Sequence, residues 1–283
     1  AACAKVPGSG RIKPAATGTT KKGEPGTTMF QRLLKRFKGG ERSPARVPEG
    51  VRVYTVGDIH GRVDLLRDLH RMIRDDASTA PGGIKKTAIY LGDYVDRGLH
   101  SREVIDLLLD EPLEGFDKVY LKGNHDDEFL GFLEDETRGP DWFRIGGDAT
   151  VYSYGIRFPG DVAPADRFSY IKNALRAAVP PRHLEFLAGL ELAREIGDYL
   201  FVHAGIRPGT ALEEQEPEDM LWIRDEFLDS RADHGKVVVH GHSVTDRPDV
   251  RENRIGIDTG TYASHERTCL VLEGATRRFL STA

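Results

Sequence analysis

Hydrophobic and polar positions follow a repeating order from residue 51 onward: an apolar run, a polar or glycine-rich turn, then an amphipathic segment. Apolar, β-branched runs at 51–56, 86–91 and 118–122 have the composition of strands. Apolar residues with helical spacing follow the first two runs, over 65–73 and 104–108. This alternation is the βαβ pattern, and it predicts an α/β protein with parallel strands.

The second half of the chain contains more apolar runs, at 198–205, 236–243, 254–258 and 268–274. The last two have no helical pattern between them, so we expect a more antiparallel sheet there. Residues 167–192 are predicted to be helical, divided by Pro180 and Pro181. No repeat or linker interrupts 51–283, which we expect to form one domain.

The first 50 residues have a different composition. Residues 1–28 are rich in Gly, Pro, Thr, Ala and Lys without periodicity, which predicts disorder. Residues 29–38 place apolar and basic side chains on opposite faces of a short amphipathic helix. Such a helix could lie on an acidic membrane surface or dock on the rest of the chain, and it could also be the start of the chain after an added leader.

Charge and cysteine content exclude several classes of protein. Residues 1–50 hold 11 Lys/Arg and three Asp/Glu, whereas 51–283 hold 29 and 42. An acidic body argues against binding of duplex nucleic acid. Cys3 and Cys269 are the only cysteines, so no disulfide framework is implied. With no apolar run long enough for a membrane span, we expect a monomeric cytoplasmic protein without stable membrane insertion.

Polar motifs follow each of the first three predicted strands. They are GDIHG (57–61), GDYVDRG (92–98) and GNHDD (123–127). The first alone could be a tight turn in which Asp58 caps the next helix. Turn chemistry has no use for histidine, however, and three such corners in succession combine histidine with carboxylate. These side chains are ligands of divalent transition metals, and asparagine adds a carbonyl oxygen.

Six candidate ligands lie at predicted strand ends, which is more than one catalytic ion needs. They are Asp58, His60, Asp93, Asn124, His203 and one of His240 or His242. Six ligands fit two ions that share a bridging carboxylate, and Asp93, in the middle of the set, is the candidate bridge. His240 and His242 are two apart on a predicted strand, so periodicity leaves both open.

The ordered motifs GDIHG, GDYVDRG, GNHD, FVHAG and VHGHS resemble the phosphoprotein phosphatase family of metallophosphoesterases, over nearly all of 51–265. The resemblance implies a four-layer α/β/β/α sandwich of two mixed sheets, with 51–283 as the catalytic domain. It places Asp58, His60 and Asp93 on one metal and Asp93, Asn124, His203 and His242 on the other. It also favours His242 over His240.

Two divalent ions would hold a bridging hydroxide that attacks phosphorus in line. The leaving oxygen then needs a proton, which His125 could deliver. If the local backbone is extended, His125 points away from the ligand Asn124, and Asp96 would hold its ring. The resemblance assigns the same roles. Arg97 is a candidate phosphate ligand, and Arg224 resembles a phosphate-binding arginine of bacterial members, with an ion pair to Asp225 or Glu226 as the alternative.

The substrate is less specified than the metal centre. Asp126 and the HAG of FVHAG depart from the eukaryotic branch, and GGDATVYSYG (146–155) resembles bacterial members. We expect a serine/threonine protein phosphatase that could also act on phosphotyrosine, or alternatively a hydrolase that splits diadenosine tetraphosphate symmetrically. Aromatic residues at 142–154 could stack on adenine, line a peptide groove or cover the sheet. The ligand set favours Mn²⁺, with Fe and Zn as alternatives.

Overall fold

The computed structural model of the protein describes residues 44–157, 163–264 and 266–282. The predicted tail up to residue 43, with the helix expected at 29–38, lies outside the described residues. The described residues belong to one compact unit that begins at Pro44. Val47 is fully buried and packs between the two sheets, so the core includes residues before 51.

The first sheet has five strands in the order β10-β9-β1-β2-β3. Strands β1, β2 and β3 run parallel, as the βαβ pattern predicts, and β9 and β10 complete the sheet in antiparallel pairing. The bounds are β1 Val51–Val56, β2 Lys85–Tyr90, β3 Phe116–Tyr120, β9 Thr268–Glu273 and β10 Thr276–Ser281.

The second sheet has the order β4-β5-β6-β8-β7. The expectation of a more antiparallel second half holds in part, because the edge strands β4 and β7 are antiparallel whereas β5, β6 and β8 run parallel. The predicted closing strand at 268–274 pairs instead with β1 in the first sheet. The bounds are β4 Ala193–Ile196, β5 Tyr199–Val202, β6 Val237–His240, β7 Asp249–Val250 and β8 Arg254–Gly256.

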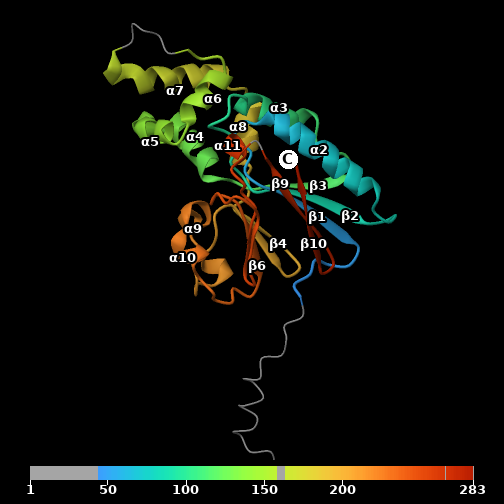
Figure 1. Cartoon of the computed structure of the whole chain (residues 1–283). Coiled ribbons are helices and arrows are strands. Elements are labelled where there is room, and N and C mark those ends of the chain that lie inside the picture. Colours follow the sequence, from blue (N-terminus) through green and yellow to red (C-terminus); the bar gives the residue numbers. More distant parts are fainter. Residues whose placement is uncertain (1–43, 158–162, 265, 283) are drawn as a thin grey trace, which may run out of the picture. The chain divides into compact units, whose positions relative to one another are not determined.

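Helices connect the strands and cover the sheets (Figure 1). The prolines at 180 and 181 separate α7 from α8, as expected. The helices are α2 Val63–Ser78, α3 Ser101–Asp110, α4 Asn124–Glu134, α5 Gly139–Arg144, α6 Gly147–Ser153, α7 Arg167–Ala178, α8 Pro181–Ala188, α9 Pro217–Trp222, α10 Asp225–Leu228 and α11 Thr261–Ser264. The helices between β5 and β6 are too short for a clear periodicity, which explains why the parallel crossover was missed.

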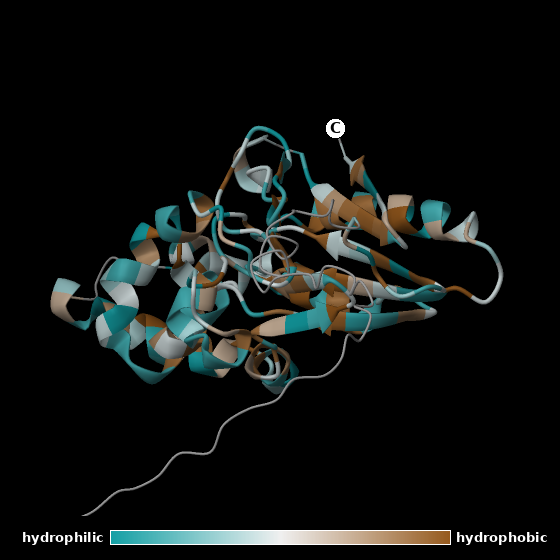
Figure 2. Ribbon diagram, turned by 90° about the horizontal axis from the view of Figure 1, so that it is seen from below, coloured by the Kyte–Doolittle hydropathy of each residue, from teal (hydrophilic) through white to brown (hydrophobic). Residues whose placement is uncertain are grey.

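Successive side chains of a strand point alternately to the helices on one face of the sheet and to the other sheet on the opposite face. In β1, Tyr54 and Val56 face the helices, whereas Val53 packs between the sheets with residues such as Ile89 and Phe201. A third cluster, including Val238 and Phe227, joins the second sheet to α9 and α10. Hydrophobic residues accordingly concentrate in the strands (Figure 2). The predicted α/β fold with two mixed sheets between helices is confirmed.

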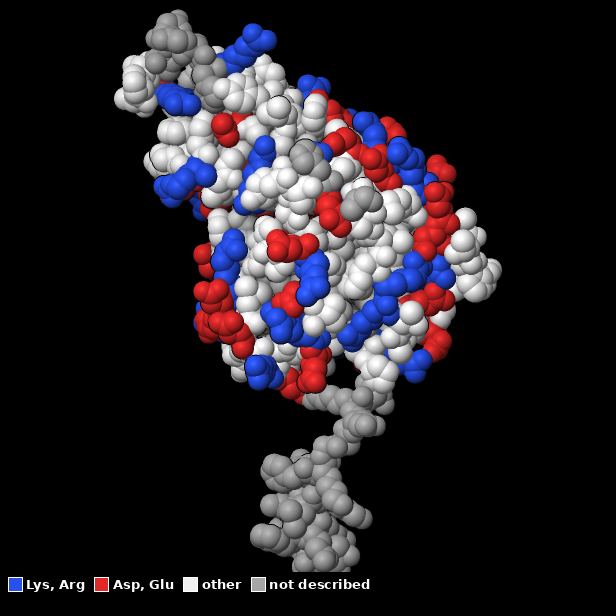
Figure 3. Space-filling view, in the orientation of Figure 1, with Lys and Arg blue, Asp and Glu red and all other residues white. Residues whose placement is uncertain are grey.

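The surface carries charges of both signs. Lys and Arg side chains are interspersed with Asp and Glu on the face shown in Figure 3. Among the described residues, no helix combines the length and the apolar character that a membrane span requires.

A partly buried charge cluster joins α2 to the first sheet. The Asp76 carboxylate accepts hydrogen bonds from Tyr54 Oη at 2.6 Å and Arg278 Nη2 at 2.5 Å, and it lies 3.4 Å from Arg52 Nη1. Burial raises the pKa of Asp76, but the donors from Arg278 and Tyr54 outweigh it and hold the pKa below its ordinary value. The Asp76 carboxylate therefore stabilises the packing of α2 while it is ionised.

Replacing Asp76 by asparagine is expected to lower the free energy of unfolding at pH 7 by about 1–3 kcal/mol, since two arginines lose their buried acceptor. The contribution of the carboxylate is present above the unfolded pKa of about 4 and is lost as the pH falls through the lower folded pKa. Urea denaturation should give a lower free energy of unfolding for Asp76→Asn than for the wild type, and an unchanged value for the exposed control Asp75→Asn. Equal stabilities at pH 7 would contradict this expectation.

Candidate metal centre

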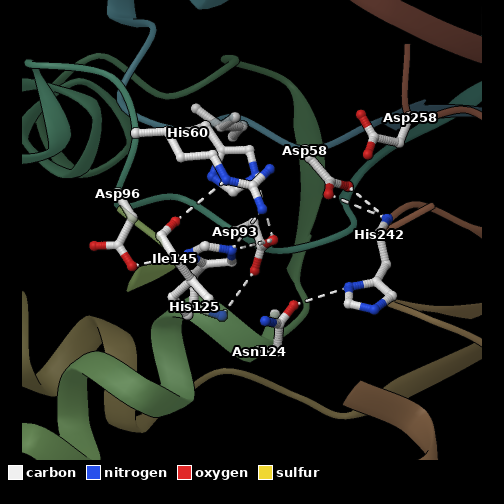
Figure 4. A network of polar contacts seen from close by, with 12 residues as sticks. Asp58, His60, Asp93, Asp96, Asn124, His125, Ile145, His242 and Asp258 are labelled. Carbon is white, nitrogen blue, oxygen red and sulfur yellow. Dashed lines mark hydrogen bonds and ion pairs between the residues drawn. The ribbon is translucent and has the colours of Figure 1, made fainter. Parts of the chain in front are cut away.

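Six parallel strands from the two sheets are each followed closely by a polar side chain. The strands are β1, β2, β3, β5, β6 and β8, and the side chains are Asp58, Asp93, Asn124, His203, His242 and Asp258. All six are buried, with at most 7% exposure. Because the carboxyl ends of parallel strands meet at one edge of a sheet, these residues converge although they come from distant parts of the sequence (Figure 4).

The Asp93 carboxylate lies at the centre of this edge. Its Oδ2 is 3.4 Å from His60 Nε2 and 3.9 Å from His125 Nε2, and its Oδ1 is 3.5 Å from His203 Nε2. Two groups of possible metal ligands result, each with its ligand atoms within 4.8 Å of one another: His60, Asp93 and His125, and Asp93, His203 and His242. Asp93 belongs to both groups, which is the position required of a bridging ligand.

The orientation of the imidazoles fits metal ions. His60 Nδ1 donates to Val95 O at 3.1 Å and His203 Nδ1 donates to Leu91 O at 2.9 Å, because a carbonyl oxygen can only accept. The Nε2 atom of each neutral ring therefore turns a lone pair toward the oxygens of Asp93. His203 Nε2 also lies 2.9 Å from Asn124 Oδ1. Lone pairs that face one another repel unless a cation lies among them, so this donor set suits divalent metal ions.

Burial keeps these rings neutral. It lowers the pKa of His60 and of His203 below the ordinary value. Burial lowers the pKa of His242 to about 2, and the nearby His203 and Arg224 contribute to this shift by disfavouring a positive charge on the ring. A metal binds imidazole through the neutral form, so these pKa shifts favour ligation.

Asp58 and Asn124 lie beside these two groups. The Asp58 carboxylate accepts the backbone N–H of His242 at 3.1 Å and does not cap α2. Asn124 Oδ1 lies 2.9 Å from His242 Nδ1. Asp258, which the sequence analysis missed, lies next to Asp58 (Figure 4), and burial and this neighbour raise the pKa of Asp58. Its position at the end of the predicted strand at 254–258 was the signal that could have identified it.

The structure separates His240 from His242. Strand β6 ends at His240, and the chain turns at His242, whose φ is 61°, so the two residues do not share a strand face as expected. His242 faces Asn124, whereas the His240 ring packs against Phe227 and its Nδ1 hydrogen-bonds the neighbouring Gly241 O. Only His242 belongs to the candidate metal groups.

His125 pairs with Asp96 beside the centre. The His125 Nδ1 donates to Asp96 Oδ2 at 2.8 Å, and its Nε2 is directed toward Asp93. Burial lowers the pKa of His125, but Asp93 and Asp96 outweigh it and raise the pKa above the ordinary value. The local backbone is not extended, because α4 begins at Asn124 and His125 lies in its first turn.

The two candidate arginines differ in their contacts. Arg97 Nη1 lies 3.0 Å from His60 Nε2, Arg97 Nη2 lies 3.1 Å from His125 Nε2, and the guanidinium stacks on Tyr262 at 4.6 Å. Arg224 is exposed near His242. The alternative partner Glu226 pairs with Arg207 instead.

Backbone strain is concentrated at this site. Among the described residues, the non-glycine residues with positive φ are His60, Asp93, Asp96, Arg97 and His242. Such conformations cost free energy and persist only where the surroundings enforce them. Asp126 provides part of that enforcement, since its carboxylate accepts the backbone N–H groups of Asp93, Tyr94 and Gly123.

Two of the four aromatic residues expected near the rim are buried. Trp142 is fully buried and Tyr154 is 4% exposed, whereas Tyr152 is 47% exposed. Trp142 Nε1 donates to Asp96 Oδ2 at 2.9 Å, and its ring stacks on Phe132. A ring buried in these contacts is not available to stack on adenine. Covering of the core, one of the three alternatives, describes Trp142 and Tyr154.

Comparison with known proteins identifies this arrangement. Residues 51–271 match the family model of the calcineurin-like phosphoesterases. The chain belongs to the calcineurin-like phosphoesterase family. It is therefore a metallophosphoesterase, a hydrolase of a family that uses a dimetal centre.

Curated relatives of this metallophosphoesterase include serine/threonine phosphatases. Serine/threonine-protein phosphatase 7 of Arabidopsis thaliana is 25% identical over 75% of the chain and 60% of its own length. The catalytic subunit of serine/threonine-protein phosphatase 4 of Candida glabrata is 40% identical over 30% of the chain and 25% of its own length. These relatives support the resemblance to the phosphoprotein phosphatase family. The matched part spans less than two thirds of each relative.

Solved structures share the fold of this metallophosphoesterase. A candidate diadenosine tetraphosphatase superposes with a TM-score of 0.55 at 20% identity, covering 84% of this chain and 98% of that one. The cold-active protein-tyrosine phosphatase of a psychrophilic Shewanella species superposes with a TM-score of 0.51 at 18% identity, covering 83% of each chain. At these identities the likeness concerns the fold.

The shared position of Asp93 predicts that Asp93→Asn weakens metal binding by more than about tenfold, because the substitution removes a carboxylate oxygen from both ligand groups. His125→Ala should retain both metal ions, because Asp58 rather than His125 is expected to complete the ligands of the first ion. Equilibrium dialysis followed by elemental analysis measures the metal content of each variant. The control Asp127→Asn, in the same helix, should bind like the wild type. Full metal content in Asp93→Asn would show that Asp93 does not bridge.

Proposed function

We propose that this metallophosphoesterase hydrolyses phosphomonoesters, with phosphoserine and phosphothreonine in proteins as its main substrates and phosphotyrosine as a further one. The observation that carries the proposal is Asp93, shared between two ligand groups with the His125–Asp96 pair directly beside it. The serine/threonine phosphatase from Arabidopsis thaliana, similar over 75% of the chain, supports the choice of substrate.

In this proposal, two divalent ions bind at the Asp93 centre. Asp58, His60 and Asp93 would hold the first ion, and Asp93, Asn124, His203 and His242 would hold the second. The ions would supply Lewis acidity to the phosphoryl oxygens and to a water molecule that serves as the nucleophile. Mixed nitrogen and oxygen ligands suit Mn, Fe or Zn better than Ca, and we propose Mn²⁺, with Fe and Zn as alternatives.

His125 acts as the proton donor to the leaving oxygen. Asp96 holds Nδ1, so the proton that can be transferred is on Nε2, on the side that faces Asp93. Arg97 is within hydrogen-bonding reach of His125 and His60, and it can turn its guanidinium to a phosphate that binds between them. Arg224, exposed near His242, would bind the phosphate from the opposite side.

Hydrolysis of diadenosine tetraphosphate is the alternative activity of the same centre. The burial of Trp142 and Tyr154 removes two aromatic side chains from contact with either adenine or a peptide, so these residues do not distinguish the two substrates. Tyr262, 41% exposed beside Arg97, is an aromatic contact available to either substrate. The expectations of a monomeric, cytoplasmic protein that does not bind duplex nucleic acid stay predictions.

Side-by-side kinetics test the proposal. With the Mn²⁺-loaded protein, kcat/KM for a phosphoserine or phosphothreonine peptide should exceed that for diadenosine tetraphosphate by more than about tenfold, equivalent to about 1.4 kcal/mol in transition-state binding. The His125→Ala variant, with its metals retained, should lose turnover of the peptide. The opposite preference would assign the dinucleotide as the substrate.

A further inference from the structure

The Asp96 carboxylate is enclosed by donors from three different helices. Its Oδ2 accepts His125 Nδ1 at 2.8 Å and Trp142 Nε1 at 2.9 Å, and its Oδ1 accepts Thr150 Oγ1 at 2.6 Å. Asp96 itself has no exposed surface. Both of its oxygens are therefore fixed. Trp142 and Thr150 hold the carboxylate, and the carboxylate in turn orients the His125 ring.

Backbone contacts strengthen the same arrangement. Asp96 N donates to Thr150 Oγ1 at 2.8 Å and to Ser101 Oγ at 3.1 Å, so Thr150 contacts both the backbone and the carboxylate of Asp96. These bonds hold Asp96 at a φ of 71°, a strained value for a residue with a side chain. The next residue, Arg97, donates its N–H to Gly146 O at 3.1 Å. The loop that carries Asp96 is thus attached to α5 and α6 rather than only to the sheets.

The donors come from rigid surroundings. Trp142 in α5 is fully buried and stacks on Phe132 with ring centroids 4.7 Å apart. Gly147, at the start of α6, approaches so closely that a Cβ there would lie 2.3 Å from the Trp142 ring. Because neither helix can shift without disturbing this packing, the two donors have fixed positions relative to Asp96.

We propose that Trp142 and Thr150 are positioning residues for proton delivery. They fix the Asp96 carboxylate, Asp96 fixes the His125 ring, and His125 Nε2 is thereby aimed at the leaving oxygen. This inference rests on the proposed function of His125. It assigns a role in turnover to α5 and α6, which contribute no candidate metal ligand.

The role depends on the leaving group. An alkyl phosphate such as phosphoserine releases a strongly basic oxygen that needs a proton in the transition state, whereas p-nitrophenyl phosphate releases a weakly basic phenolate that hardly needs one. Loss of positioning should therefore slow the alkyl substrate selectively. A change that only loosens the fold or the metal centre would slow both substrates alike.

Trp142→Phe and Thr150→Val test this inference. Trp142→Phe removes the hydrogen bond to Asp96 Oδ2, and Thr150→Val removes the bonds of the hydroxyl to Asp96 Oδ1 and Asp96 N while keeping the shape of the side chain. For a phosphoserine peptide we expect kcat to fall by about tenfold or more, with KM unchanged, and kcat for p-nitrophenyl phosphate to stay within about twofold. Thr150→Ser keeps the hydroxyl and should retain both activities. Tyr154→Phe is the matched control, since it removes a hydroxyl of the same region that contacts His183 instead.

Metal content and thermal unfolding of each variant show whether it is folded, and Trp142→Phe decides the matter if Thr150→Val does not fold. Equal losses for both substrates, or no loss for the peptide, would overturn this inference alone. A wild-type protein that hydrolyses neither substrate would overturn the proposed function and this inference together.

Discussion

The candidate metal centre depends on the repulsion between lone pairs that surround the buried Asp93 carboxylate. Asp93 faces the Nε2 atoms of His60 and His203, and each of these rings uses its Nδ1 proton on a backbone carbonyl. The accepting carbonyls belong to Leu91 and Val95, close to Asp93 in the chain, so a single loop sets both the central oxygen atoms and the orientation of the rings around them. These facing lone pairs become favourable when metal cations lie between the Asp93 oxygens and the Nε2 atoms.

Holding that arrangement requires close contacts between loops. A Cβ at Gly123 would lie 2.0 Å from Asp93 Oδ1, and one at Gly92 would lie 2.4 Å from Gly123 N. These glycines let the second and third motifs touch, and the Asp126 carboxylate then binds the N–H groups of both. Positive φ values at ligand positions cost about 1–3 kcal/mol each in general, which the surrounding hydrogen bonds and packing must offset.

The two sheets and the helical segment α4–α6 contribute different parts of the site. Strand ends of the two sheets present the ligand candidates, whereas α4 carries His125 and α5 and α6 surround its partner Asp96. The aromatic side chains of this segment stabilise that arrangement from within. Trp142 illustrates the point, since a residue whose role the sequence left open between ligand contact and core is a fully buried hydrogen-bond donor.

Strand periodicity and the order of the polar motifs determined much of this protein from sequence alone. Local composition identified β1, β2 and β3 and the candidates that follow them, because an apolar run and the turn after it are short-range features. The choice of His242 over His240 needed the resemblance to a family, since the positive φ at His242 that separates the two has no sequence signal in a histidine.

Only the tertiary structure decided the features that depend on distant contacts. Asp258 follows a three-residue strand and becomes notable only when β8 pairs with β6 and brings it beside Asp58. The parallel direction of β5, β6 and β8, the passage of β9 into the first sheet and the bonds from Trp142 and Thr150 to Asp96 likewise join residues far apart in the chain. Periodicity reports which face of an element is buried, but it does not report which element covers that face, so these partners became evident only in the folded molecule.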